Sequence, residues 1–333
     1  MKVLVCTNAL SVMNGTIFHR LYQPFKDLSE CGLEIEFCAD FLSQQYTELL
    51  KYDVVVVSRT LTYNPNLHEQ ALAYWHNMPK STRLIVDLDD YWNLPENHPN
   101  INHWRTHETS QCIIDTLRLA SQVWTTNKEL LKKIGKVNNK VKIIPNSIKP
   151  GEYKKNAAHV TRLGICVNNT HEMNLPLLAS GLFDLDKNKY ELHLLGADSS
   201  RKSNVQQFLN IDENKLRYKH YEWTKPINYH VNYENIDVML CPLYANYFNK
   251  FRSELKLDEG AAYKFKVIAS NYGPYHNKES AGVITTKKHF NDLNNLLFEL
   301  ETQSLPNVKN SWSSCQQLRL DNLLHLVYNH NGN

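Results

Sequence analysis

The sequence predicts an α/β protein with two Rossmann-like domains that face a central cleft, and with a C-terminal helix that crosses back to the first domain. Three observations support this fold class. The 333 residues are enough for two domains of ordinary size. Short runs rich in Val and Ile alternate with helical patterns, as expected for strands buried on both faces of a parallel sheet. Residues 145–151, rich in Pro, Asn and Gly, separate two such arrays and predict a hinge.

The first domain is predicted over residues 1–148 as a doubly wound array. Each expected strand is a short apolar run, for example the four consecutive valines at 54–57. The six strands are expected at residues 2–7, 33–38, 53–58, 83–88, 122–126 and 141–144. The helical patterns between them cover residues 18–30, 43–50, 65–77, 106–120 and 127–134.

The second domain is predicted over residues 149–311, followed by a separate C-terminal helix in 312–333. Strands are expected at residues 162–167, 190–195, 216–220, 236–242 and 266–270. Helices are expected near 175–183, 204–209, 226–233 and 253–263. Residues 312–328 carry leucines at amphipathic spacing, which predicts a helix that packs across both domains.

Composition limits the class of protein. Hydrophobic residues make up 42% and charged residues 21% of the chain, and there are 11 Gly and 12 Pro, which excludes collagen-like and low-complexity chains. The seven cysteines are scattered without a CxxC pair, so the sequence predicts neither a disulfide framework nor a structural zinc site. The apolar run at the N-terminus is too short for a signal peptide or a membrane span, and we expect a cytoplasmic protein. A net charge of +3 does not by itself indicate nucleic-acid binding.

The most informative segment is residues 248–262. A helix that begins near Ser253 would bring free backbone N–H groups, the Ser253 hydroxyl and the Arg252 guanidinium together at an anion site, as a diphosphate requires. Lys256 and Glu259, three residues apart, adjoin on one helix face. Arg252 and Lys256 could neutralise a leaving diphosphate, and Glu259 could accept bonds from ribose hydroxyls. The alternative is a solvated, capped helix with a surface ion pair.

This segment, Phe-Asn-x-x-Arg-Ser-x-x-Lys-x-x-Glu followed by Val-Ile-Ala-Ser and Gly-Pro-Tyr, resembles the donor-binding half of GT-B glycosyltransferases of the retaining group four, in a compact phage or bacterial form. Residues 15–20, 121–131 and 144–148 are similar to other parts of that family, in the expected order. The resemblance implies a nucleotide diphosphate sugar held mainly by the C-terminal domain and an acceptor held mainly by the N-terminal domain. It also implies that no metal or other cofactor is obligatory.

Two departures from the family pattern stand out. Many members carry Glu-x7-Glu here; the second glutamate matches Glu259, but Phe251 occupies the first position and cannot accept a hydrogen bond from a sugar hydroxyl. The first loop has the single Gly15 in place of a glycine pair, which makes a close backbone approach to a phosphate less favourable. Gly15 nevertheless remains a predicted donor-binding residue.

The acidic loop Asp87-Leu88-Asp89-Asp90 follows an expected strand and has three interpretations. Asp89 and Asp90 could orient or deprotonate an acceptor hydroxyl, with Asp87 in the acceptor site. The carboxylates could instead bind a divalent metal beneath a diphosphate. They could also cap the next helix or bind its loop.

Further candidates have functional and structural alternatives. His171, after the first strand of the second domain, could donate to a phosphate or belong to a turn that caps the helix at Asn174. Arg20 could reach the donor phosphates or lie on the surface. His107 is a candidate catalytic residue on the acceptor side. The rings of Trp92 and Trp104 could stack on the acceptor or pack in the core.

We therefore expect a hexosyl- or pentosyltransferase that moves a sugar from a nucleotide diphosphate sugar, such as a UDP-sugar, to an acceptor hydroxyl. The Asn, Lys and Tyr richness, typical of an AT-rich genome, favours a hydroxymethylated base in phage DNA as acceptor, in which case the enzyme would act in the host cytoplasm. The alternatives are a bacterial polysaccharide or lipid-linked glycan as acceptor, and a non-catalytic nucleotide-sugar-binding module.

Overall fold

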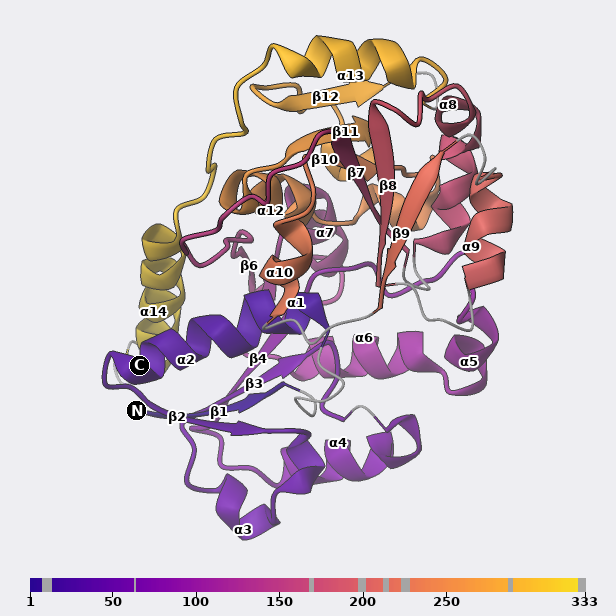
Figure 1. Ribbon diagram of the computed structural model, residues 1–333. Coiled ribbons are helices and arrows are strands. Elements are labelled where there is room, and N and C mark those ends of the chain that lie inside the picture. The colour runs from indigo at the N-terminus through magenta and orange to yellow at the C-terminus, as the bar shows by residue number, and fades with distance from the viewer. Residues whose placement is uncertain are drawn as a thin grey trace. The chain divides into compact units, whose positions relative to one another are not determined.

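Two parallel sheets of six strands each organise the chain in the computed structural model (Figure 1). The structure describes residues 1–7, 14–62, 64–167, 171–196, 202–211, 216–222, 228–286 and 290–328, and the statements below refer to these residues. Unit 1 contains Met1–Leu94, Asn100–Lys149 and Asn310–Asn333, and unit 2 contains Pro95–Pro99 and Pro150–Lys309. The predicted α/β class with two Rossmann-like arrays is confirmed.

The sheet of unit 1 has the strand order β2-β1-β3-β4-β5-β6. All six expected strands form, and their ends shift by at most one residue from the predicted ends. The central strands, such as β3, were predictable because their runs of apolar residues are buried on both faces. Their bounds are β1 Lys2–Cys6, β2 Glu34–Cys38, β3 Val54–Ser58, β4 Arg83–Leu88, β5 Gln122–Thr125 and β6 Val141–Ile143.

Helices α2 and α4 lie on opposite faces of this sheet (Figure 1). The expected helix at 18–30 begins earlier, at Gly15, because the Asn14 side chain accepts a bond of 2.9 Å from Ile17 N, and it includes a π-helical turn at Phe18–Tyr22. The helices of unit 1 up to residue 149 are α1 Gly15–Ile17, α2 Gln23–Glu30, α3 Tyr46–Leu49, α4 His68–His76, α5 Ile101–Thr106, α6 Thr109–Leu119 and α7 Lys128–Ile134.

The helix predicted at residues 106–120 forms as α6 and begins three residues later, at Thr109. Glu108 has φ +47°, a left-handed conformation that interrupts a helix, and it separates α5 from α6. The additional helix α5 was not predicted, because its sequence of Asn, His, Trp and Arg has no apolar periodicity.

Helix α14, Trp312–Tyr328, belongs to unit 1. Leu323 and Leu326 lie in the same core cluster as Phe25 of α2. Two polar contacts fix the first turns: Trp312 Nε1 donates to Asp27 Oδ2 at 2.8 Å, and Gln316 Nε2 donates to the Pro24 carbonyl at 2.8 Å. The predicted amphipathic tail is thus a helix with the predicted bounds, packed against α2.

The sheet of unit 2 has the order β12-β11-β10-β7-β8-β9. Its strands are β7 Thr161–Cys166, β8 Tyr190–Leu195, β9 Arg217–Tyr221, β10 Val238–Cys241, β11 Lys266–Ser270 and β12 Val283–Thr286. The edge strand β12 was not predicted because it is only four residues long. It begins directly after Gly282, which has φ +67°, and a polar sequence follows it.

The helices of unit 2 are mostly short. The predicted helix at 175–183 starts as a 3-10 helix, Glu172–Leu178, in which Pro176 lacks an amide hydrogen, and α13 was not predicted. Within the described residues, no helix combines the length and apolarity needed to cross a membrane. The α-helices are α8 Ala179–Phe183, α9 Lys202–Leu209, α10 Tyr229–Tyr233, α11 Tyr247–Lys250, α12 Leu255–Tyr263 and α13 Leu293–Glu301.

Candidate functional site

A cluster of charged side chains lies at the carboxyl edge of the unit 2 sheet. His171 follows β7, and Arg252 precedes α12. Arg252 NH1 lies 3.2 Å from His171 Nδ1, and the Arg252 guanidinium lies 5.4 Å from the centre of the Phe248 ring. Two predicted donor-binding residues that are 81 positions apart are thereby brought together. Asn169 and Thr170, next to His171 in the sequence, lie outside the described residues.

His171 is held in its neutral form. Loss of hydration and the positive charges of Arg252 and Lys256 lower the pKa of His171 well below its ordinary value. A neutral imidazole can accept a hydrogen bond from Arg252 through one ring nitrogen and donate through the other. His171 therefore orients the guanidinium without adding a further positive charge.

Lys256 and Glu259 form a buried ion pair through Lys256 Nζ and Glu259 Oε2. Their side chains are 18% and 2% exposed, so the prediction that they adjoin is confirmed and the alternative of a surface pair is wrong. Tyr233 completes the group: its hydroxyl lies 2.9 Å from Lys256 Nζ and 3.1 Å from Glu259 Oε2. Burial opposes the Lys256 charge, but Cys166, Glu259 and Tyr233 outweigh it and raise the pKa of Lys256 well above its ordinary value.

Helix α12 begins at Leu255, two residues later than predicted. The N-cap residue is Glu254, and its side chain makes no capping hydrogen bond. Its carboxylate is bound by Lys278 at 2.7 Å and by Lys309 at 2.6 Å instead. The expectation that Ser253 starts the helix is therefore wrong, while Ser253 stays in the loop between Arg252 and the first turn.

Asp258, on the same helix, is buried, and its Oδ2 has no hydrogen-bond partner among the described residues. Burial and the nearby carboxylate of Glu254 raise the pKa of Asp258 to about 8. Since an unfolded Asp titrates near 3.9, the folded state keeps a proton that the unfolded chain has lost between these pH values. Stability contributed by this group therefore falls as pH rises from about 4 to 8.

We expect Asp258→Asn to gain stability relative to the unmodified protein as pH rises, by up to about 1.4 kcal/mol per pH unit between pH 5 and 8. Denaturant unfolding of both proteins at pH 5, 6.5 and 8 measures this difference. A pH-independent difference would show that Asp258 is ionised in the folded state.

In unit 1, Arg20 and Asp87 form a buried bidentate ion pair. Arg20 Nε and NH2 donate to the two Asp87 oxygens at 2.7 and 2.6 Å, and both side chains are at most 4% exposed. Arg20 NH1 also donates to the Ile144 carbonyl and to Asn146 Oδ1, each at 3.0 Å. The expectations of Arg20 as a phosphate ligand or a surface residue, and of Asp87 as an acceptor ligand, are corrected: the two side chains bind each other in the interior.

A second arginine lies close to this pair. Arg319 of α14 is fully buried, and its Nε and NH2 atoms have no hydrogen-bond partner within the described residues. Burial and the Arg20 charge lower the pKa of Arg319 to about 10. Asp87 thus binds one buried guanidinium and acts on a second through its charge, and its removal would leave Arg20 with the charge of Asp89 but without its bidentate partner.

Asp89 and Asp90 both bind Arg59, a residue that was not predicted to belong to the site. Arg59 NH2 lies 3.2 Å from Asp89 Oδ1 and 3.0 Å from Asp90 Oδ2. Arg59 adopts φ +67°, and its amide donates to the Asp87 carbonyl, so backbone geometry aims it at the acidic loop. One guanidinium thus contacts both carboxylates of the acidic loop. The helix-cap alternative is wrong, because the next helix begins at Ile101 with Asn100 as its N-cap.

The aromatic candidates are anchored within unit 1. Trp92 is buried, and its carbonyl accepts from Trp104 Nε1 at 2.8 Å and from Ser110 Oγ at 2.8 Å. These contacts favour the packing role over stacking on an acceptor. His107 ends α5 with its ring centre 4.4 Å from that of His103.

Gly15 is the first residue of α1. The loop that precedes it, residues 8–13, is outside the described part of the chain. The predicted approach of this loop to a phosphate therefore stays a prediction.

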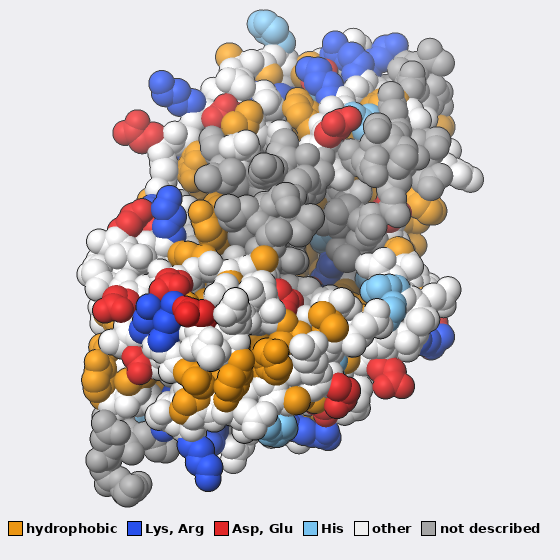
Figure 2. Space-filling model, turned by 90° about the horizontal axis from the view of Figure 1, so that it is seen from below, with side chains coloured by type: hydrophobic (Ala, Val, Ile, Leu, Met, Phe, Trp, Pro, Cys, Tyr) orange, Lys and Arg blue, Asp and Glu red, His pale blue; other side chains and the backbone are white. Residues whose placement is uncertain are grey.

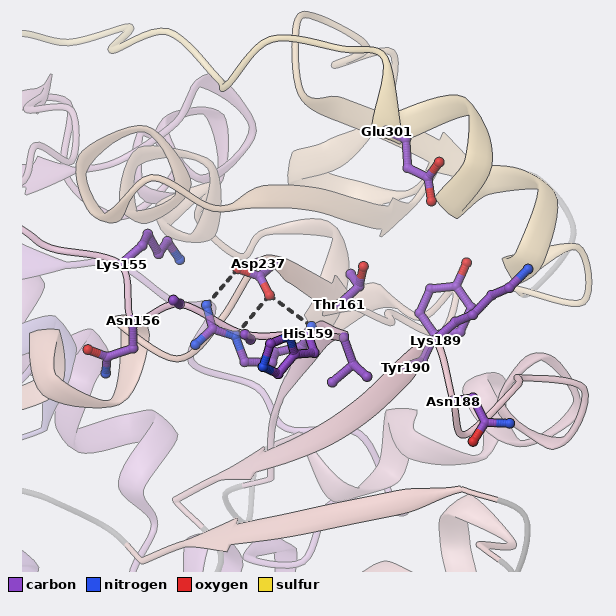
Figure 3. Close-up of a pocket in the computed structure, with 13 residues that line it drawn as sticks. Lys155, Asn156, His159, Thr161, Asn188, Lys189, Tyr190, Asp237 and Glu301 are labelled. Carbon is purple, nitrogen blue, oxygen red and sulfur yellow. Dashed lines mark hydrogen bonds and ion pairs between the residues drawn. The ribbon is translucent and has the colours of Figure 1, made fainter.

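A separate open cavity of about 570 Å³ lies at the opposite, amino edge of the unit 2 sheet (Figure 3). Arg162 and Asp237 both line it. Arg162 NH2 donates to Asp237 Oδ1 at 2.8 Å, and Arg162 Nε donates to Asp237 Oδ2 at 2.9 Å. Burial lowers the pKa of Lys155 to about 8, and its amine donates to the Tyr233 carbonyl at 3.1 Å. The cavity is thus lined by polar side chains that bind one another, and Lys155 connects its lining to the backbone of Tyr233.

Neither a protein-family model nor a curated protein matches the sequence. Several solved structures are similar in fold. Alr3699/HepE of Anabaena, in complex with UDP and glucose, is 13% identical over 97% of this chain and 99% of that chain, with a TM-score of 0.67. The lipopolysaccharide outer core galactosyltransferase WaaB is 13% identical over 99% and 100%, with a TM-score of 0.55. UDP-GlcNAc 2-epimerase of Neisseria meningitidis, bound to UDP-GlcNAc, is 10% identical over 97% and 100%, with a TM-score of 0.57.

These similarities cover the whole chain at low sequence identity and therefore concern the fold. The fold is that of GT-B proteins, as the sequence predicted. Fold does not determine reaction, because glycosyltransferases and an epimerase both occur among these structures.

Proposed function

We propose that the protein is a glycosyltransferase that uses a nucleotide diphosphate sugar, with UDP as the nucleotide. The observation that carries this proposal is the group of Arg252, His171, Lys256 and Glu259 at the carboxyl edge of the unit 2 sheet. Ligands of open α/β sheets bind at this edge. Two structures of similar fold contain UDP or UDP-GlcNAc, and the resemblance of residues 248–262 to the retaining group four implies a donor site in this segment.

The residues of this cluster have distinct roles in the proposal. Lys256 is already paired with Glu259, so its charge is partly compensated, and Arg252 supplies most of the stabilisation of the leaving diphosphate. The neutral His171 fixes the direction of the guanidinium. Glu259 accepts a hydrogen bond from the ribose. The protein thus stabilises the charge that develops on the diphosphate when the bond between sugar and phosphate breaks.

Arg252→Ala is expected to weaken UDP binding about tenfold or more, which corresponds to about 1.5 kcal/mol, the low end for a lost hydrogen bond to a charged group. Isothermal titration with UDP measures the change. Arg217→Ala is the matched control, because Arg217 is exposed and binds the Lys187 carbonyl. Equal affinities of Arg252→Ala and the unmodified protein would place the diphosphate elsewhere.

Removal of divalent cations by EDTA is expected to leave turnover within about twofold. Arginine and lysine supply the positive charge that a metal provides in other transferases, and Asp89 is bound to Arg59. Initial rates with EDTA, and with added Mg²⁺ or Mn²⁺, test this expectation. Activity that disappears with EDTA and returns with Mn²⁺ would restore the metal interpretation of the acidic loop.

For the acceptor we propose a saccharide hydroxyl, as in a polysaccharide or lipid-linked glycan. One protein of similar fold is a lipopolysaccharide galactosyltransferase. On the face in Figure 2, Lys and Arg side chains lie in separate small groups, several beside Asp or Glu, whereas DNA binding favours a continuous basic stripe. The expectation of a DNA acceptor depended on the amino-acid composition of the chain and on its resemblance to a compact phage form of the family. Hydroxymethylated double-stranded DNA therefore serves as the comparison substrate.

The acceptor experiment compares UDP release with glycan acceptors, with hydroxymethylated DNA and without acceptor. Release that depends on a glycan supports the proposal. Transfer to DNA that weakens steeply with salt would instead support the DNA acceptor. Conversion of UDP-GlcNAc to an epimer without an acceptor would assign the chain to the epimerase reaction.

A further inference from the structure

Tyr233, the last residue of α10, lies between the two charged residues of the proposed donor site. It is buried, and its hydroxyl contacts both Lys256 Nζ at 2.9 Å and Glu259 Oε2 at 3.1 Å. This role could not be predicted from the sequence, because Tyr233 precedes Lys256 by 23 residues and belongs to no motif.

The chemistry of the three groups fixes the direction of both hydrogen bonds. A lysine ammonium has donors only, so the Tyr233 oxygen accepts from Lys256. The phenolic proton must then point to Glu259, whose ionised carboxylate has acceptors only. Burial and the Glu259 charge raise the pKa of Tyr233 well above its ordinary value, which keeps that proton in place. Lys256 and Tyr233 thus both bind Oε2 of Glu259.

The remainder of Tyr233 is held from the other side. Its carbonyl accepts from Lys155 Nζ at 3.1 Å. Its ring centre lies 4.7 Å from that of Tyr263 and 5.3 Å from that of Phe265. A side chain fixed at its backbone, ring and hydroxyl orients a carboxylate better than a mobile one does.

We propose that Tyr233 is a positioning residue that orients Glu259 toward the ribose of the donor, and that it thereby sets a preference for ribonucleoside over 2′-deoxyribonucleoside diphosphates. This inference rests on the proposed function. With Oε2 bound by Tyr233 and Lys256, the other oxygen, Oε1, is the acceptor for a ribose hydroxyl. Loss of one of the two donors lets the carboxylate rotate, and its contact with the ribose weakens.

The experiment compares the affinities of UDP, 2′-deoxy-UDP and inorganic diphosphate for the unmodified protein and for Tyr233→Phe. We expect the unmodified protein to bind UDP about tenfold more tightly than 2′-deoxy-UDP, as for a lost hydrogen bond to a charged group. In Tyr233→Phe this ratio should fall below about threefold, while the affinity for inorganic diphosphate changes little. Tyr263→Phe is the matched control: it removes a tyrosine hydroxyl but keeps the ring that packs against Tyr233, and it should retain the tenfold ratio.

Other outcomes separate this inference from the proposed function. If Tyr233→Phe weakens UDP and 2′-deoxy-UDP equally, Tyr233 has only a structural role and the inference is wrong, while the donor site stands. If the unmodified protein binds UDP without a ribose preference, the inference is also wrong. If the unmodified protein binds neither nucleotide, the proposed function itself fails.

Glu259→Gln provides a second route, because it keeps the shape of the side chain if Tyr233→Phe folds poorly. It should remove the same ribose preference, and adding Tyr233→Phe to it should cause no further loss of the ratio. A ratio that remains tenfold in Glu259→Gln would show that Glu259 does not contact the ribose, and would overturn the inference.

Discussion

Replacement of Asp87 by Ala is expected to lower the free energy of unfolding by about 3–5 kcal/mol, the range for loss of one partner from a buried ion pair. Asp87 binds Arg20 through both oxygens, and the fully buried Arg319 lies close by. The variant would remove the bidentate partner of Arg20 and a compensating negative charge near Arg319. For a domain of ordinary stability this loss is a large fraction of the total.

Denaturant unfolding measures the effect. Asp53→Ala is the control, because Asp53 is also an aspartate of the same sheet, directly before β3, but its side chain is half exposed. The control should change stability by less than about 1 kcal/mol, as surface ion pairs do. Adding Arg319→Met to Asp87→Ala should recover part of the loss, since it removes one of the uncompensated charges. An Asp87→Ala protein as stable as the original would show that water or an ion compensates the arginines.

The second large effect is expected at the acidic loop. We propose that Asp89 orients or deprotonates the acceptor hydroxyl, and that Asp90 assists it. Asp89→Asn or Asp90→Asn should lower kcat by roughly a hundredfold or more, the effect typical of a lost general base, with little change in UDP affinity. The amide can still accept a bond from Arg59, so the loop should keep its conformation.

Steady-state kinetics with varied donor and varied acceptor separate these effects. Asp321→Asn, on the exposed side of α14, is a control for loss of a carboxylate in the same unit. If Asp89→Asn and Asp90→Asn keep full turnover, the loop is structural and His107 becomes the next candidate. If they abolish UDP binding and leave the acceptor KM unchanged, the proposed division of donor and acceptor roles between the units is wrong.

The fold could be predicted because the central strands of both sheets are buried on both faces. A run such as residues 54–57, four fully buried valines, has few alternatives to a central strand. Helix α14 was predicted with its bounds because its leucines recur at helical spacing. Elements without such a signal were missed: β12 is a short edge strand, and α5 is rich in polar and aromatic residues.

The contacts of the site could be predicted where its members are close in sequence, and His171 and Arg252, 81 positions apart, were each predicted as donor-binding residues but not as partners of each other. The spacing of Lys256 and Glu259 places them on one helix face, and their contact follows. Tyr233 and Arg59 were missed, because each reaches its partners through the tertiary fold. Arg20 and Asp87 were predicted as ligands, and their mutual pairing over 67 positions could not be read from either segment alone.

The position of α14 also bears on how the chain is made. Unit 1 draws on both ends of the chain, with residues 1–149 and 310–328, while unit 2 is mostly one continuous segment between them. On the ribosome, residues 1–149 emerge first but lack the Leu323 and Leu326 side chains of their core until the whole of unit 2 has been synthesised. Unit 2 can therefore complete its folding before unit 1, although unit 1 begins first. In the interval, the apolar face of α2 that α14 covers is open to chaperones or to premature association.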